Sequence, residues 1–494
     1  MQNTRTVISA EVCGMSAKLV NVKCTVTDGL GVQTFGLKID DCNEMMLNIS
    51  TAIQARGYNM PGKKVVVEIE TEDHNPVFNV SSLSLPIAIS ILAASNQVDL
   101  PGLENFIVCG DLDLNGSVQQ VGGTVQIAQL AKSNGRACII PTINHPTVAE
   151  LFRDKIPIYP VSTLDEAILV AGGQQTTTAW EMWMRSDADF DPEYEGWWET
   201  LAGYPGNQRA IEIAAAGNHN MLLVGNDYVL KTKCAHALVE ILPQMTDEEI
   251  LETAKVYSLC GARTAHNPYV RPLRMPYYAS SFLTIVGGSH ANIILPGDES
   301  LANNGVLFID NIERVRTSMA TLLSQVAEDR KVVISRLKTK ITFPARGILL
   351  LGSQPDSGDK GNILNIPPNL AARIDMQTVV ASDPRPDSKS IYELETVRKR
   401  IALARKRQEE RFEGEEYRTN NLIPARDLDK YCDFTEKSIV DKIIDRLNLS
   451  VQALTPMLRV ARTIADLENS DRVMPEHVAE ASSYRFLDRN PMTK

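Results

Sequence analysis

Several features that define common protein classes are missing from this chain of 494 residues. No run of about 18 uncharged apolar residues occurs, which excludes a membrane-spanning helix. The eight cysteines form no C-x-x-C pair and no cluster with zinc-ligand spacing, so we expect reduced and mostly buried thiols. The first residues, MQNTRTVISAEVCG, contain no apolar core of the kind that a secretory signal needs. These absences favour a cytoplasmic protein without membrane contact.

An excess of positive charge is also missing. The chain has 50 basic and 61 acidic residues. Its net charge of −11 indicates that the protein surface, taken as a whole, does not attract polyanions. A local basic groove or pore stays compatible with this charge. The hydrophobic fraction of 44% is typical of globular proteins, and the length suggests about three domains.

Residues 1–170 alternate strand-like and helix-like segments, which predicts an α+β or α/β domain. The β-branched segments VISAEV, LVNVKCTVT and KVVVEIETE predict strands, and CNEMMLNISTAIQARG and LPIAISILAAS have apolar residues at helical spacing. Asn115-Gly116 predicts a hairpin turn, because both residue types tolerate a positive φ.

Residues 171–198 form a predicted linker that is acidic and rich in tryptophan. All four tryptophans of the chain lie here, at Trp180, Trp183, Trp197 and Trp198, among acidic residues that include Asp187, Asp189, Asp191, Glu193 and Glu195. The segment is either a docking site for a partner or a connector whose tryptophans pack on the next domain. The connector is the simpler interpretation.

Residues 199–385 predict a doubly wound α/β core, and residues 386–494 predict helices. MLLVG, GVLFID and GILLLGS are apolar runs of the kind found in buried parallel strands, with helical segments between them. In the C-terminal part we expect Thr455 to cap a helix whose first residue is Pro456.

One loop of this core has the spacing of a phosphate-binding loop. After MLLV, the residues from Gly225 to Lys231-Thr232 match G-x-x-x-x-G-K-[ST] except at the second glycine. About 80 residues later, an apolar strand ends in Asp310, where phosphate-loop proteins place the carboxylate that helps to hold Mg²⁺. Together, each in its expected context, the two motifs predict a nucleotide site of this class.

Longer strings identify a family. GNQRAIEIAAAGNHNMLLVG, PGDESLANNGVLFID, KVVISRLKTKITFPARGILL and LRVARTIADL closely resemble the magnesium-chelatase-like AAA+ proteins of the ComM/YifB subfamily. GDLDLNGSVQQVGG and LPIAISILAAS resemble the Lon-protease-like domain of that family. The resemblance implies a ring-forming ATPase with a helical lid, and association with DNA branch migration for ComM itself.

The chain departs from the family pattern where nucleotide chemistry takes place. The family loop resembles G-P-P-G-S-G-K-T, but here Tyr228 and Leu230 replace glycines and Asp227 adds negative charge near the phosphate position. Asn311 replaces the Glu that polarises the attacking water, and an amide cannot take up the proton. Glu313 is a weak candidate to substitute for it.

Further departures affect the residues that sense nucleotide. Gln354 stands at the position of the polar sensor Asn, and Gln452 at that of a sensor Arg. The family's R-A-P-H-H segment reads Arg274-Met-Pro-Tyr277-Tyr278. The resemblance retains Arg373 as a possible arginine finger toward a neighbouring subunit, and Arg459 and Arg462 in the lid.

Basic residues at two places are candidates for contact with DNA. Lys338 and Lys340 lie on a predicted hairpin that, in related rings, projects toward the central channel. The runs at residues 398–400 and 405–407 are either a DNA contact or a solvated helix face paired with nearby glutamates.

The Lon-like part lacks a protease pair. By resemblance Ser84 falls at or near the serine position, but the lysine that would activate it falls near Ile127. We therefore expect no protease activity and interpret Ser84 as a helix-capping or core residue.

These observations predict a ring-forming AAA+ protein, most simply a hexamer, that is deficient in ATP hydrolysis and serves as an assembly or regulatory scaffold. Gly225, Lys231, Thr232, Asp310, Gln354 and Arg459 would contact ATP and Mg²⁺, weakly or not at all, with Thr232 and Asp310 as the metal ligands. A protein partner is expected and DNA binding should be weak. The alternatives are a divergent DNA-translocating ATPase and a chelatase-like remodeller of a metal-cofactor protein.

Overall fold

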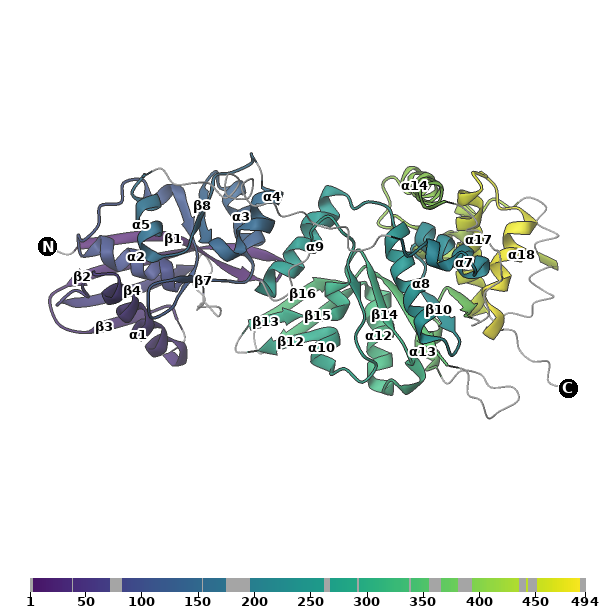
Figure 1. The fold of residues 1–494 in the computed structure, drawn as a ribbon, viewed down its shortest axis with the longest axis horizontal. Coiled ribbons are helices and arrows are strands. Elements are labelled where there is room, and N and C mark those ends of the chain that lie inside the picture. The colour runs from purple at the N-terminus through teal and green to yellow at the C-terminus, as the bar shows by residue number, and fades with distance from the viewer. Residues whose placement is uncertain are drawn as a thin grey trace.

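The structure is a computed structural model, and the residues it describes form three parts along its longest axis (Figure 1). The described residues are 3–37, 39–71, 82–152, 154–174, 196–261, 267–290, 293–336, 339–354, 366–380, 393–434, 441–442 and 451–488. The N-terminal strands and helices lie at one end, a parallel sheet lies in the middle and the C-terminal helices lie at the other end (Figure 1).

A four-stranded sheet in the order β1-β2-β4-β3 opens the chain. Strands β1, β2 and β4 are antiparallel, and the short edge strand β3 runs parallel to β4. Every residue of helix α2 is buried, so α2 is a core helix rather than an amphipathic surface helix. The elements are β1 (Asn3–Cys13), β2 (Ser16–Thr27), β3 (Val32–Phe35), α1 (Ile39–Ala55), β4 (Lys64–Thr71) and α2 (Ser84–Ala94).

A second, parallel sheet in the order β5-β8-β9 follows, with helices on it. Between β5 and β8 in the chain lies the predicted hairpin of β6 and β7. Of its two predicted turn residues, only Gly116 has a positive φ (75°). Asp113 Oδ1 accepts hydrogen bonds from the backbone N–H groups of Asn115 and Ser117. The elements are β5 (Phe106–Val108), β6 (Asp111–Leu112), β7 (Val118–Gln119), α3 (Thr124–Ser133), β8 (Ala137–Pro141), α4 (His145–Leu151), β9 (Ile158–Val161) and α5 (Leu164–Ala171).

The middle part is built on a five-stranded sheet in the order β11-β14-β17-β10-β18, in which every neighbouring pair is parallel. Strands β10, β14 and β17 are buried at every residue, which explains their continuous apolar sequences. The sheet and its main helices are α7 (Pro205–Gly217), β10 (Met221–Val224), α8 (Tyr228–Ile241), α9 (Asp247–Leu259), β11 (Leu273–Arg274), β14 (Val306–Ile309), α12 (Thr317–Asp329), β17 (Ile348–Ser353), α13 (Pro368–Ala371) and β18 (Met376–Val379).

Two antiparallel ribbons and two short helices are inserted between the strands of this sheet. One ribbon is formed by β12 and β13, and the other by β15 and β16, which is the predicted hairpin. The elements are α10 (Phe282–Val286), β12 (Gly287–His290), β13 (Ile293–Pro296), α11 (Asp298–Leu301), β15 (Lys331–Arg336) and β16 (Thr339–Pro344).

The C-terminal part is helical among its described residues, and these helices share a core with α7 and α8. Pro456 lies inside α17 rather than at its first position, so the predicted start at Thr455 is wrong. The described helix already begins at Val451. The helices are α14 (Leu394–Arg411), α15 (Leu428–Tyr431), α17 (Val451–Leu467) and α18 (Pro475–Ser483).

Two of the four tryptophans lie in the described part of the chain. Trp198 is 1% exposed in the shared core, and the Trp197 ring stacks on His236 of α8 at 4.3 Å between centroids. These two side chains pack as the connector interpretation expects. Trp180 and Trp183 lie outside the described residues.

Among the described residues, no helix combines the length and the apolarity needed to cross a membrane.

Candidate nucleotide site

The connection between β10 and α8 is short and tightly packed. The Gly225 N–H donates to the carbonyl oxygen of Ser353 at 2.9 Å, and a Cβ atom at Gly225 would lie 2.2 Å from the carbonyl oxygen of Val380. Glycine is therefore required here by the close approach of the neighbouring strand end, independently of any phosphate.

Asp227 closes the N-terminus of α8. It is the N-cap residue, and its Oδ1 accepts a hydrogen bond from the backbone N–H of Leu230 at 2.9 Å. Free N–H groups at a helix N-terminus are what a phosphate-binding loop offers to its ligand. Here the Asp227 carboxylate accepts a hydrogen bond from one of them. From the sequence alone, we expected Asp227 only to repel a phosphate by its charge.

The two side chains that replace loop glycines differ in their exposure. Leu230 is 2% exposed and belongs to the core, whereas Tyr228 is 54% exposed. Leu230 therefore fixes the first turn of α8 by packing, and the loop cannot open without exposing this apolar side chain.

Lys231 and Asp310 form a buried ion pair. Lys231 Nζ lies 2.5 Å from Asp310 Oδ1, and the lysine side chain is fully buried. In this position the ammonium group is bonded inside the protein instead of reaching toward a phosphate. The two motifs found in the sequence thus meet in space and form an ion pair with each other.

Three oxygens of Asp310 and of the residues next to the ion pair in sequence are buried and lack hydrogen-bond partners. They are Thr232 Oγ1, Asp310 Oδ2 and Asn311 Oδ1. Hydroxyl, carboxylate and amide oxygens are suitable ligands for Mg²⁺, so these donors fit a hard cation. The phosphate cradle does not fit, because the Asp227 carboxylate already takes the Leu230 N–H, one of the helix N-terminal donors that a phosphate would use.

Glu313 cannot freely take the role of the missing catalytic Glu. Its Oε2 accepts a hydrogen bond from Ser353 Oγ at 2.9 Å, which ties it to the end of β17. Gln354 follows Ser353 directly and is partly buried. Gln452 lies in α17, but its side chain is outside the described part.

Arg373 lies at the opposite end of the strands from the loop. It precedes β18, whose strand register places Met376 beside Met221 and Val379 beside Val224. Its guanidinium forms an ion pair with Glu328 of α12, and Arg373 Nε is buried without a hydrogen-bond partner. The loop and Arg373 are thus at the two ends of the strands.

Arg459 is held by the C-terminal helices. Its Nε donates to the carbonyl oxygen of Ile423 at 2.7 Å, and burial lowers the pKa of its guanidinium. Arg462 is buried and donates to Asp466 and to two backbone carbonyls, so its role is structural.

A buried polar relay, which the sequence did not indicate, links the sheet to α17. His219 is fully buried, and its Nδ1 lies 3.3 Å from Asp375 Oδ2 while its Nε2 lies 2.7 Å from Thr463 Oγ1. A Cβ atom at Gly217 would lie 2.1 Å from His219 Nε2, so this glycine makes room for the relay. In the sequence, the only sign of this buried site is a glycine and a histidine, Gly217 and His219, just before the strand that begins at Met221.

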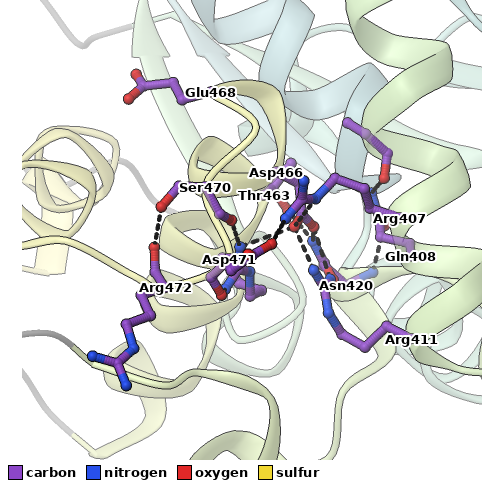
Figure 2. Close-up of polar contacts among 12 residues, drawn as sticks. Arg407, Gln408, Arg411, Asn420, Thr463, Asp466, Glu468, Ser470, Asp471 and Arg472 are labelled. Carbon is purple, nitrogen blue, oxygen red and sulfur yellow. Dashed lines mark hydrogen bonds and ion pairs between the residues drawn. The ribbon is translucent and has the colours of Figure 1, made fainter.

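The basic runs at residues 398–400 and 405–407 divide into two groups. Lys399 and Lys406 are exposed, and Lys406 lies 4.0 Å from Glu410, as a solvated helix face predicts. The arginines instead contact neighbouring elements. Arg400 pairs with the buried Glu212 at 2.7 Å, and Arg405 donates to the carbonyl oxygen of Ala215. Arg407 pairs with Asp471 and lies beside Asp466 (Figure 2). The arginine side chains are already bonded within the chain and are therefore poor candidates for DNA binding.

Lys340 is exposed on β16, opposite Ser335 of β15. Lys338 lies outside the described residues. The described lysine is thus available to a ligand, as the hairpin interpretation requires.

Ser84 is a buried residue and not a helix cap. The N-cap of α2 is Leu83, and Ser84 Oγ donates to Asp111 Oδ1 at 2.6 Å. Burial raises the pKa of the Asp111 carboxyl. Ile127 is fully buried in α3, so the position near which a lysine base is expected holds an apolar core residue.

Three family models match parts of this chain. The family described as magnesium chelatase, subunit ChlI, matches residues 198–363, its C-terminal part matches 393–485, and a family described as subunit ChlI of Mg-chelatase matches 22–144. The uncharacterized protein YifB of Salmonella typhimurium and the competence protein ComM of Haemophilus influenzae are each 30% identical to this chain, over 96% of both chains.

The chain belongs to the magnesium-chelatase-like ComM/YifB family. It is therefore a AAA+-type protein, and the mixed α/β architecture with its parallel sheet is consistent with that fold. An archaeal Lon protease of Methanocaldococcus jannaschii is 36% identical over 86 residues, which are 17% of this chain and 13% of that protease. Family membership suggests nucleotide and Mg²⁺ binding and a tendency to oligomerise.

Proposed function

We propose that this ComM/YifB family member is a ring-forming AAA+ protein that does not hydrolyse ATP efficiently and acts as an assembly or regulatory scaffold. The observation that carries the proposal is the closed loop: Asp227 caps α8, and Lys231 is buried in an ion pair with Asp310. To bind ATP the chain would have to break this ion pair and displace a carboxylate from the helix N-terminus. Asn311 then offers no base for the attacking water.

The proposal assigns a role to each part of the chain. Residues 1–170 would be an inactive Lon-protease-like domain, 171–198 a linker, 199–385 the AAA+ core and 386–494 the lid. If nucleotide enters at all, Thr232 and Asp310 would hold Mg²⁺, Gly225, Lys231, Gln354 and Arg459 would lie along the nucleotide, and Arg373 would reach it from a neighbouring subunit. In a ring, the exposed Lys340 and the neighbouring Lys338 would face the channel.

The test is phosphate release with ATP and Mg²⁺, run beside the Lys231→Ala variant. Removal of one catalytic base or charge-stabilising donor commonly lowers a rate by about 10²–10⁴-fold, and several are changed here. We expect wild type and variant to be indistinguishable from background. Robust turnover that Lys231→Ala abolishes would refute the scaffold proposal. Restoring Leu230→Gly and Asn311→Glu together should not produce turnover, because Asp227, Gln354 and Gln452 remain.

A divergent DNA-translocating ATPase is the second candidate, supported by the exposed Lys340 on the β15–β16 ribbon. It is tested by titrating salt against duplex and forked DNA with wild type and with Lys338→Ala/Lys340→Ala. Tight binding at physiological salt that the double variant loses would favour this candidate. A chelatase-like remodeller, suggested by the family description, would instead require turnover without DNA.

A further inference from the structure

A small cavity lies at the end of the parallel strands that is opposite to the candidate nucleotide loop. Asn220, which precedes β10, and Leu349, at the start of β17, both line it. Its polar lining side chains are Asn220, Glu299 and Arg330, and its other lining residues are alanines, leucines and a glycine. The space holds about one group the size of a water molecule. The residues of the closed loop do not line this cavity.

Glu299 of α11 brings a buried carboxyl group to the cavity. It is 8% exposed, and within the described part of the chain its carboxyl has no hydrogen-bond or ion-pair partner. The neighbouring Asp298 is already paired with Arg274. A buried carboxyl without a partner keeps its proton, because an isolated charge is costly away from water, and burial raises the pKa of Glu299 accordingly. At neutral pH Glu299 therefore offers the cavity an O–H donor without a negative charge.

Arg330 brings a positive charge to the same cavity from a strained position. It is the C-cap residue of α12 and has a left-handed backbone, with φ 53° and ψ 30°, where glycine is the usual residue. Its Nη2 donates to the carbonyl oxygen of Arg346 at 2.6 Å, and among the described residues it forms no ion pair. Burial and the neighbouring Arg346 lower the pKa of Arg330 to about 10, so it stays charged at neutral pH. Strain of this kind persists where the surrounding structure requires the side chain, often at a binding site.

The charges around the cavity leave the Arg330 guanidinium without a counterion in contact. Asp375 is near enough to raise the pKa of Arg330, but its Oδ2 accepts a hydrogen bond from the Asn220 N–H and lies 3.3 Å from His219 Nδ1. Arg346 adds a second positive charge nearby, which pairs with Glu252 at 3.3 Å. Buried charges in proteins are normally paired, so the group that completes this cavity is an anion.

We propose that this cavity is a binding site for a small monovalent anion, with chloride as the representative ion. The anion accepts hydrogen bonds from the Arg330 guanidinium and from the Glu299 carboxylic acid. Room for about one water-sized group excludes phosphate, sulfate, nucleotides and organic acids, and leaves halide ions. Binding stabilises the folded chain, because the unfolded chain has no such site.

The experiment measures chloride binding to the full-length protein at pH 7 in two ways. The line width of the chloride NMR signal increases when the ion exchanges with a protein site, and bromide should compete for that site. The urea midpoint is measured in sodium chloride and in sodium gluconate, both at an ionic strength of about 0.15 M, so that screening is equal. Gluconate is too large for the cavity. For the wild type we expect line broadening that saturates with protein, and a urea midpoint that rises as chloride replaces gluconate.

Variants assign the effect to the two side chains. Arg330→Gly removes the guanidinium and suits the positive φ, so it should fold at least as stably as wild type in gluconate. It should bind chloride roughly 10-fold more weakly or worse, as expected for the loss of a hydrogen bond to a charged group. Glu299→Gln keeps a neutral donor and should keep the affinity, whereas Glu299→Leu lacks the donor and should lose it.

Arg346→Gln is the matched control. It removes an arginine that is 56% exposed at its side chain and lies beside the site, while the backbone carbonyl that Arg330 contacts remains. This variant should bind chloride almost as wild type does.

Three results would overturn the proposal: no chloride broadening by wild type, equal broadening by wild type and Arg330→Gly, or a loss in Arg346→Gln as large as that in Arg330→Gly. The first would leave the cavity to water, and the last would assign the effect to surface charge. Phosphate release is not measured here, so these outcomes leave the scaffold proposal standing.

Discussion

Lys231 illustrates how a single residue can match a motif and yet have a different role. Its spacing from Gly225 is that of a phosphate-binding lysine, but it is fully buried and bonded to Asp310. In a buried ion pair, the desolvation of each charge is offset mainly by its partner. The pair is thus a structural element, and losing one partner should affect stability before it affects chemistry.

We therefore predict that Lys231→Met lowers the free energy of unfolding by about 3–5 kcal/mol, because it leaves the Asp310 carboxylate buried without a cation. Replacing both partners, as Lys231→Met/Asp310→Leu, should recover most of the loss, since apolar residues can substitute for a buried ion pair. Urea denaturation measures both. Lys399→Met, at an exposed position of α14, is the control. Equal stability of wild type and Lys231→Met would show that the ion pair does not persist in solution.

Glu299 is a second residue whose environment determines its behaviour. Burial, together with the neighbouring Asp298, raises its pKa to about 8 from an ordinary value of 4.5. It lines a small cavity with Asn220 and Arg330. The folded protein therefore holds a proton on Glu299 at neutral pH that the unfolded chain has released.

Because the folded state binds the extra proton, stability should fall as pH rises from about 4.5 to about 8, the two pKa values of this group. The slope from one such group reaches at most about 1.4 kcal/mol per pH unit. Glu299→Gln mimics the protonated carboxyl and should remove this part of the slope. Urea midpoints of wild type and variant at pH 5, 6, 7 and 8 test this; parallel pH profiles would contradict it.

At the scale of elements, α14 is fixed to its neighbours by charge as well as by apolar packing. Asp466 of α17 is fully buried at its side chain and accepts hydrogen bonds from Arg411, Arg462 and Asn420 (Figure 2). Gln408 of α14 donates to the carbonyl oxygen of Ala216 in α7 at 2.9 Å. These contacts join α14, α17 and α7 into one unit.

We predict that Asp466→Ala destabilises this unit by about 3–5 kcal/mol, because two guanidinium groups would remain buried without their anion. Hydrogen exchange should show loss of protection in α14 and α17 ahead of the N-terminal strands. Glu410→Ala removes an exposed carboxylate that lies 4.0 Å from Lys406 and should be nearly neutral. Uniform loss of protection over all three parts would indicate instead that the chain unfolds as a single unit.

At the scale of the whole molecule, α9 connects the N-terminal part to the sheet. Met245, Ile250 and Ala254 pack with α3 in one apolar core, and Gln126 of α3 donates to the carbonyl oxygens of Gly14 and Lys255. The Gly123 N–H donates to the carbonyl oxygen of Ser258 at 2.8 Å. These contacts pack α9 against α3 and against residues of β1 and β2.

Since the loop is satisfied within the subunit, we predict that assembly does not require nucleotide. Sedimentation at micromolar concentration should show a closed oligomer, most simply a hexamer, with the same distribution with and without ATP and Mg²⁺. The Lys340→Ala variant, altered on an exposed ribbon, should assemble as wild type does. A strictly monomeric profile without ATP, or assembly only with ATP, would contradict the prediction.

Much of this protein was predictable from its sequence because the signals are local. β-Branched alternation located β1, β2 and β4, and continuous apolar runs located β10, β14 and β17. The same apolar runs predicted the parallel sheet, and the family strings showed Asn311 and Leu230 as departures from the family pattern. Turn geometry and helix starts were less certain, as Asn115 and Pro456 show.

Only the tertiary structure decided what the polar residues do, because their partners are distant in sequence. Lys231 meets Asp310 across 79 residues, and Arg405 reaches Ala215 across 190. A sequence shows which side chains carry charge but not whether that charge faces solvent or a buried partner. The composition and periodicity of this chain therefore determined its strands and helices, whereas the closing of its loop and the pairing of its arginines follow from long-range packing, where each buried charge must find its counterpart.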